Sequence, residues 1–212
     1  MHKVSLNCPK RHHLKLTSFF VTNNKLFIVL SIVLLVGVFC GSILVKFFDK
    51  NTFSLIGTLL VQDLIERGSE SFLNIFIASI SAVSIFILPA FLMGLSAWGY
   101  LLAPLVPFTR GLCIGLASGY IYLSYGLKGM GFYALVFLPG IFTSVFAVLL
   151  VTQEAILFSK HYVSMIFSKN VTFGNPTKRY ILKISLALFL VIVSGGVDVF
   201  FSLIFSNLFV IG

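Results

Sequence analysis

Near the middle of the chain, residues 107–120 read PFTRGLCIGLASGY. Arg110 is the only charged residue between Glu70 and Lys128, and glycine follows it at positions 111, 115 and 119. A charge at the centre of a membrane helix costs roughly 2.5–3.5 kcal/mol. Small residues four apart allow two membrane helices to approach closely. The stretch therefore predicts a membrane helix with a close helix neighbour and an arginine that needs a partner.

Composition indicates the same class for the whole chain. Of the 212 residues, 58% are hydrophobic and 10% are charged, whereas soluble domains carry about 25% charged residues. A helix needs about 20 apolar residues to cross a bilayer. The sequence predicts an all-α polytopic membrane bundle of about five transmembrane helices. The expected spans are residues 26–45, 73–93, 110–125, 132–158 and 181–205.

Basic residues predict the orientation. They cluster in the tail, residues 1–25, and in the loop between the fourth and fifth spans, and five spans place both on one side. The positive-inside rule makes that side cytoplasmic. We therefore expect residues 26–212 to form one transmembrane domain in the cell membrane, with a cytoplasmic N-terminus and an external C-terminus. The net charge of +9 then reflects topology and contact with membrane lipid, and no nucleic-acid partner is expected.

Two segments between the spans carry further expectations. Residues 94–109 are apolar but short and contain two prolines, so we interpret them as an interfacial or re-entrant cytoplasmic segment. If they crossed the membrane, the C-terminus would move to the cytoplasm. Residues 53–67 have the spacing of an external amphipathic helix. The helix either lies on the membrane surface or packs on the bundle, or it docks an extracytoplasmic partner through polar residues within it and just after it. They are Asp63, Glu66, Arg67 and Glu70.

Among the charged residues within or at the edge of predicted spans, we single out Arg110, Glu154 and Asp198. We place Arg110 at the cytoplasmic start of its span, where it either snorkels to the interface or pairs with Glu154 at similar depth. A third interpretation gives these charges to an ion or substrate pathway. Asp198 lies toward the outer end of the fifth span, within reach of Lys46 or Lys128.

Small residues mark two helix faces, and both predict close helix packing. The packing is either within the bundle or against another chain, including a second copy. Pro139-Gly140 is expected to kink the fourth span. The residues of the two faces are Gly37 and Gly41 in the first span, and Gly111, Gly115, Ser118 and Gly119 in the third.

Motifs of catalysis are missing from the sequence. It contains no HExxH, nucleophile-elbow or phosphate-loop pattern, so we expect no enzymatic activity and no cofactor. Its three cysteines form no CxxC pair, and its four histidines lie outside the predicted spans. A metal site is therefore not expected.

Residues 93–158 resemble the central part of the stage II sporulation protein M family. Both have a glycine-serine start, a proline-containing apolar segment, a basic residue followed by glycines, and a leucine-proline step. Here the basic residue is arginine, where the family often has lysine, and Gly140 follows the proline where the family often has a polar residue. The matching positions are Gly94-Leu95-Ser96, Gly99, Phe108-Thr109-Arg110-Gly111, Gly115, Gly119 and Leu138-Pro139.

The resemblance implies a non-enzymatic scaffold in the septal and engulfing membrane of the mother cell. Such a scaffold recruits peptidoglycan-degrading partners, stage II sporulation proteins D and P, which thin the septal wall during endospore engulfment. An amphipathic external helix is what an anchor for such enzymes needs. The alternative is a small permease or an accessory subunit of a membrane transporter, with Arg110, Glu154 and Asp198 lining a path.

Overall fold

The computed structural model describes residues 24–48, 72–96, 98–167 and 176–205. In these residues the chain is helical, and five helices are long and apolar enough to cross a membrane, as the sequence predicts. The helices in chain order are α2 (Asn24–Leu44), η1 (Val45–Phe47), α4 (Phe72–Leu95), α5 (Gly99–Leu102), α6 (Leu105–Val136), α7 (Leu138–Phe167) and α8 (Pro176–Phe205).

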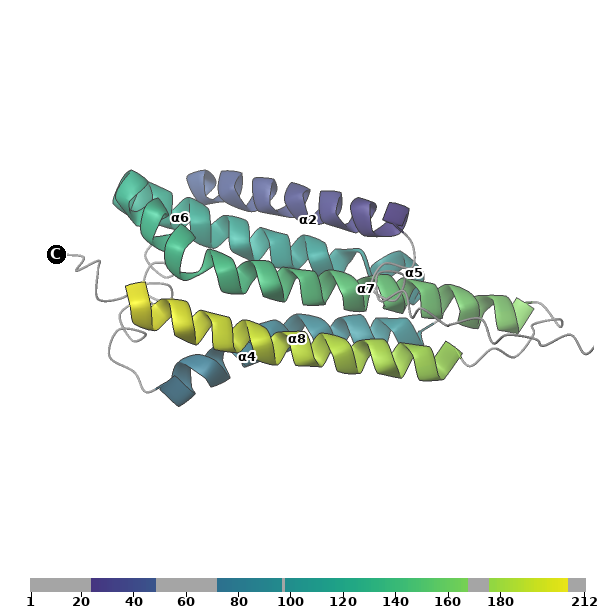
Figure 1. The fold of residues 1–212 in the computed structure, drawn as a ribbon. Coiled ribbons are helices and arrows are strands. Elements are labelled where there is room, and N and C mark those ends of the chain that lie inside the picture. Colours follow the sequence, from purple (N-terminus) through teal and green to yellow (C-terminus); the bar gives the residue numbers. More distant parts are fainter. Residues whose placement is uncertain (1–23, 49–71, 97, 168–175, 206–212) are drawn as a thin grey trace, which may run out of the picture.

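The long helices lie side by side along one axis (Figure 1). We call the end where α2 begins the proximal end and the opposite end the distal end. α4 ends, α6 begins, α7 ends and α8 begins at the proximal end. The segments before α2 and between α7 and α8 therefore attach at the same end, as five spans require.

α7 is the central helix of the bundle. It contacts α2, α4, α5, α6 and α8, whereas α2 packs mainly on α6 and α4 packs on α8. Of the apolar window of α7, 61% is buried, against 28% in each of the other four spans. The bundle thus consists of the helix pair α2–α6 and a group of three helices, α4, α7 and α8, in which α7 also contacts both helices of the pair.

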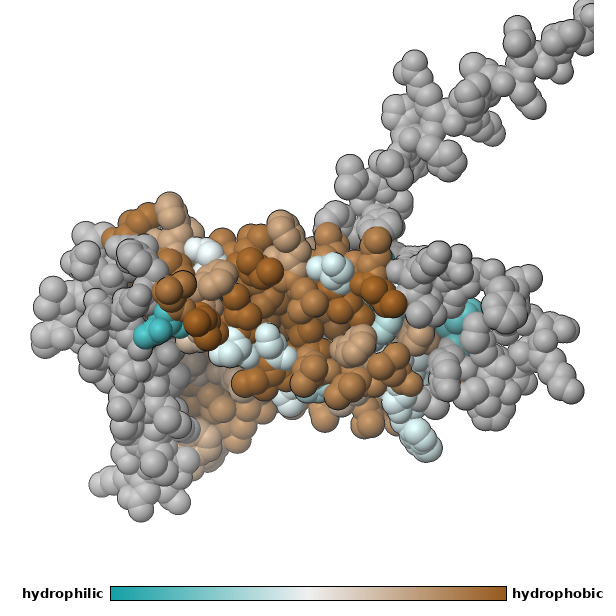
Figure 2. Space-filling view, turned by 90° about the horizontal axis from the view of Figure 1, so that it is seen from below, coloured by the Kyte–Doolittle hydropathy of each residue, from teal (hydrophilic) through white to brown (hydrophobic). Residues whose placement is uncertain are grey.

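Apolar side chains cover the outside of the bundle. Figure 2 shows one face that is mainly hydrophobic along most of its length. Phe39, Ile85 and Phe189 are each more than 60% exposed. A water-soluble surface does not carry a continuous apolar covering of this kind, but lipid tails solvate it without cost. The exposed apolar faces are therefore the lipid-contacting surface.

The segment 94–109 forms a tight proximal connection and does not cross the bundle. After α4 it makes the short helix α5, and α6 then begins at Leu105. Pro104 is the N-cap residue of α6 and Pro107 falls in its first turn, where a missing N–H leaves no intrahelical bond unmade. The buried Ser159 of α7 ties the segment down, donating to the Ser96 carbonyl at 2.7 Å and accepting from the Tyr100 N–H at 3.0 Å.

The turn between α6 and α7 corrects one expectation. Pro139-Gly140 falls in the first turn of α7, directly after a one-residue break at Phe137 whose backbone stays helical, so the sharpest bend is not at this pair. The sharp bend lies earlier, at Gly126, whose φ of 61° is accessible to glycine at little cost. The last residues of α6, including Tyr133, therefore turn back toward the bundle.

The orientation relative to the membrane stays a prediction. In a background without cysteines, one new cysteine would replace Ser69, between α2 and α4, and another would replace Ser168, between α7 and α8. The two segments join helix ends at opposite ends of the bundle. An impermeant thiol reagent added to intact cells should label position 69 and leave position 168 unlabelled. Labelling of position 168 alone would reverse the orientation.

Candidate functional site

A seam of glycines joins α2 to α6. The two helices run parallel, and the glycines of each meet the backbone of the other. A methyl group added at Gly37 would lie 3.2 Å from the Leu112 nitrogen, and one added at Gly115 would lie 3.0 Å from the Ser42 nitrogen. Each would also overlap a carbonyl oxygen, of Phe108 and of Val38 respectively. The backbones therefore touch, and no larger residue fits here without moving a helix.

The remaining predicted small residues belong to the same seam. Gly41 faces Leu112 and Leu116, Gly111 faces Leu34 and Val38, and Gly119 faces Ser42. Ser118 lies beside them and donates to the carbonyl of Gly115 at 3.1 Å. The structure thus places the small residues of the first and third spans against each other within the bundle. We call this contact, made by Gly37, Gly41, Gly111, Gly115 and Gly119, the glycine seam.

The seam places Arg110 in the middle of the bundle. Its neighbour Gly111 lies level with Leu34 and Val38, which is halfway along the candidate span Lys25–Phe47. The expectation of an arginine at the start of its span was therefore wrong. The reason is that α6 begins at Leu105, so Arg110 is more than one turn inside the helix.

Arg110 is held between α7 and α4. One terminal NH₂ group donates to Ser144 Oγ at 3.1 Å, and the guanidinium carbon lies 5.1 Å from the centre of the Phe86 ring. An arginine over an aromatic face gains a cation–π attraction, which is larger where water is excluded. Ser144 in turn donates to the carbonyl of Ile141 at 2.9 Å. The Nε–H of Arg110 is buried without a hydrogen-bond partner among the described residues.

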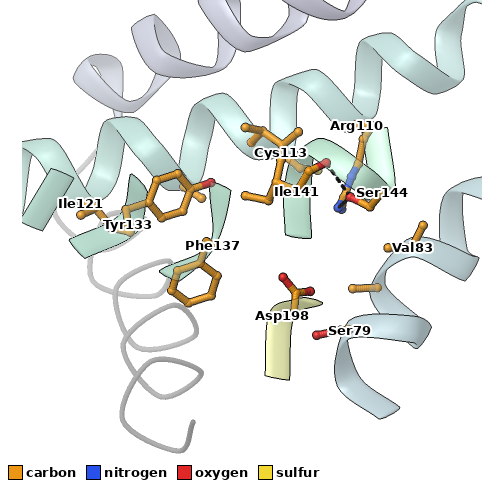
Figure 3. Close-up of a pocket in the computed structure, with 13 residues that line it drawn as sticks. Ser79, Val83, Arg110, Cys113, Ile121, Tyr133, Phe137, Ile141, Ser144 and Asp198 are labelled. Atoms are coloured by element: carbon orange, nitrogen blue, oxygen red, sulfur yellow. Dashed lines mark hydrogen bonds between the residues drawn. The ribbon is translucent and has the colours of Figure 1, made fainter. Parts of the chain in front are cut away.

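A cavity of about 180 Å³ lies beside the guanidinium, between α4, α6, α7 and α8. Besides Arg110, the Cys113 thiol and four oxygen-bearing side chains line it; the four are those of Ser79, Tyr133, Ser144 and Asp198. Figure 3 shows the Asp198 carboxylate and the tip of Arg110 at the same space. We call this space the Arg110 cavity. The rest of its wall is apolar and includes Val83, Ile114, Ala117, Ile121, Phe137 and Ile141.

The fold positions Asp198 through a glycine. A methyl group added at Gly140 would overlap the Asp198 carboxylate, so this carboxylate lies directly against the first turn of α7. Ser194, one turn earlier in α8, donates to the Gly140 carbonyl at 2.8 Å. From the sequence, we expected Asp198 to lie within reach of Lys46 or Lys128. The structure places it in the Arg110 cavity.

Tyr133 and Ser79 complete the polar lining. Tyr133 follows the third candidate span, and burial raises its pKa to about 12, although the charge of Arg110 opposes this shift. Its hydroxyl therefore stays protonated and remains a hydrogen-bond donor. Ser79 is only 4% exposed, and its hydroxyl has no hydrogen-bond partner among the described residues. No sequence pattern singles out either residue, because serine and tyrosine are common in membrane helices.

Glu154 pairs with Lys183 and not with Arg110. Lys183 Nζ donates to Glu154 Oε1, and both side chains are 7% exposed. Glu154 lies ten residues along α7 from Ser144, the contact of Arg110, which is about 15 Å along a helix. The predicted Arg110–Glu154 pair was wrong because Arg110 lies deeper than expected. The signal for the real partner was Lys183 itself, which lies three residues inside the apolar span predicted for residues 181–205.

The three charges predicted to line one path therefore belong to two places. Arg110 and Asp198 share the Arg110 cavity, and Glu154 lies with Lys183 nearer the proximal end. In the described part of the chain, no group of three metal-ligating side chains gathers at one point. The proposed docking residues Asp63, Glu66, Arg67 and Glu70, with the predicted helix 53–67, lie outside the described residues.

Comparison with protein-family models, curated proteins and solved structures finds no match to this chain.

The glycine seam predicts that bulk is excluded at Gly115. Replacing Gly115 by leucine should lower the free energy of unfolding by about 3 kcal/mol or more, because the side chain would overlap the backbone of α2. The same change at Gly131, where an added methyl group meets nothing within 4 Å, is the control. Thermal unfolding and membrane accumulation measure both. Equal stability of the two variants would contradict a seam that excludes bulk.

The buried pair predicts non-additive mutations. Lys183→Met should cost about 3–5 kcal/mol, because it leaves the Glu154 carboxylate buried and unpaired. The double variant with Glu154→Leu removes both charges and should be more stable than Lys183→Met alone. Thermal unfolding of the purified chain in detergent measures this, and Lys160→Met, at an exposed lysine of α7, should change little. Strict additivity would show that the two charges do not stabilise each other.

Proposed function

We propose that this chain is a non-enzymatic membrane scaffold of the stage II sporulation protein M type. It holds peptidoglycan-degrading partners at the outer surface of the septal and engulfing membrane during endospore engulfment. Stage II sporulation proteins D and P are the partners that the resemblance implies. The proposal rests on the resemblance of residues 93–158, and features of the bundle support it.

The main support is that the glycines which carry the resemblance pack the helices of the bundle against one another. An added methyl group at Gly94 would overlap the Tyr180 hydroxyl, and one at Gly99 would overlap the Met93 carbonyl. Gly111 and Gly115 form the glycine seam. Close packing of this kind is what a scaffold needs, because its task is to hold a shape. The residues that carry the resemblance therefore serve helix packing, which favours a scaffold.

The position of the connection between α2 and α4 also supports the proposal. The last described residue before it, Phe48, and the first after it, Phe72, both lie at the distal end. The connection therefore leaves from and returns to the side that the positive-inside rule makes external. Its sequence carries acidic residues in a chain of net positive charge, which suits electrostatic selection of a basic partner surface.

The scaffold predicts that the acidic residues of this connection recruit the partners. Reversing Asp63, Glu66 and Glu70 to lysine should leave the amount of protein in the membrane unchanged, because these positions lie outside the five candidate spans. Recovery of peptidoglycan hydrolases with the cross-linked chain from sporulating cells should fall about tenfold. Like charges at a docking surface repel and slow association.

A charge-preserving variant is the matched control. Asp63→Glu, Glu66→Asp and Glu70→Asp together keep the acidic surface and should recover the hydrolases as the unmodified chain does. Normal recovery with the lysine variant would place the docking surface elsewhere. An origin in an organism that forms no endospores would contradict the proposed process as a whole.

A further inference from the structure

We infer that the Arg110 cavity is a binding site for a small zwitterion that carries a carboxylate and an ammonium group, with a simple α-amino acid as the ligand class. This inference goes beyond the scaffold proposal and does not rest on it. It starts from hydrogen-bond donors that the fold leaves unused, continues with the charge balance of the cavity, and ends with its size.

The unused donors indicate an anionic oxygen ligand on one side of the cavity. The Nε–H of Arg110 and the hydroxyl of Ser79 are both buried and have no partner among the described residues. A buried polar group without a partner is costly, and proteins retain few of them. The neutral Tyr133 hydroxyl is a third donor at the wall. A carboxylate is a strong acceptor for such groups, and a charged donor such as arginine strengthens the contact.

The charge balance of the cavity favours a ligand of zero net charge, so a ligand with the carboxylate that the unused donors favour needs a positive group as well. Arg110 and Asp198 line the same space, so their charges offset each other before any ligand enters. A plain carboxylate would leave one uncompensated negative charge among apolar side chains, which is expensive in a membrane. An ammonium group on the same molecule restores neutrality, and the Asp198 carboxylate lies at the wall to attract it.

The size and remaining walls of the cavity fit this class. About 180 Å³ holds several water molecules or a solute of several non-hydrogen atoms. The apolar part of the wall comes from Val83, Ile114, Ala117, Ile121, Phe137 and Ile141, which suits a small aliphatic side chain. A larger substrate, such as a nucleotide or a sugar phosphate, exceeds this space.

The direct test is binding of defined solutes to the purified full chain. Isothermal titration calorimetry in detergent compares L-alanine with propionate, which lacks the ammonium group, and with ethylamine, which lacks the carboxylate. Glycine and L-serine test the size limit. At least one of the three amino acids should bind saturably, and propionate and ethylamine at least tenfold more weakly. Absence of amino-acid binding, or equal binding of propionate, would overturn the inference.

The Ser79→Ala variant tests ligand binding without a loss of stability. Because the Ser79 hydroxyl has no partner in the described structure, its loss should not lower the thermal stability of the free chain. It should weaken amino-acid binding about tenfold, because a hydrogen bond to a charged group is lost. Ser84→Ala, on the same helix but with its hydroxyl donating to the Ile80 carbonyl, should bind normally. Equal affinity of the two variants would exclude Ser79 from the site and overturn its assignment.

Asp198→Asn tests the ammonium side. It should remove amino-acid binding and favour propionate relative to alanine, because Arg110 is then uncompensated. If alanine binding were unchanged, Asp198 would have no part in recognition and the zwitterion assignment would fail. These results are independent of hydrolase recovery, so they distinguish failure of the binding site from failure of the scaffold.

Discussion

The contact between the backbones of α2 and α6 sets the register on which the rest of the bundle depends. In a membrane, lipid tails are as apolar as the side chains, so the hydrophobic effect does not press helices together. Close contact must come from dispersion forces, which fall off steeply with separation. Glycines on both helices bring the backbones within contact. Once α6 is held in this register, the depth of Arg110 follows.

Charged side chains buried among the helices are costly, and the bundle stabilises them in two different ways. Glu154 and Lys183, near the proximal end, form a direct buried ion pair. Arg110 is deeper, and its contacts are mixed: a serine hydroxyl, an aromatic face and a cavity shared with a carboxylate. In a direct ion pair, each charge neutralises the other. The surroundings of Arg110 leave its Nε–H and the Ser79 hydroxyl without a partner among the described residues.

The proposed scaffold role and the proposed binding site are compatible in one molecule. A scaffold needs a rigid body, and the glycine seam together with the central α7 provides one. The Arg110 cavity lies among the four helices α4, α6, α7 and α8, so a bound ligand would contact the elements on which that body depends. The connection between α2 and α4 leaves from the distal end, toward which Asp198 of α8 also lies.

Much of the architecture is readable from the sequence. Five apolar runs of sufficient length give five helices, since only helices satisfy every backbone group within such a run, and the glycine spacing gives the faces that meet. The sequence also shows which residues are charged within the spans. It misplaced the bend, because a proline at the start of a helix and one in its interior look alike in a sequence, and the turn falls at Gly126.

Only the tertiary structure decided how the charges are distributed. Pairing of charges depends on the relative depth of side chains on different helices, and a shift of one turn moves a group by about 5.4 Å. The few residues by which α6 begins earlier than expected move Arg110 away from Glu154 and into a space with Asp198. Ser79 and Tyr133 reach that space through packing and a backbone bend. Helix length is a local property of sequence, whereas a cavity is made by residues far apart in the chain, and no local pattern records them.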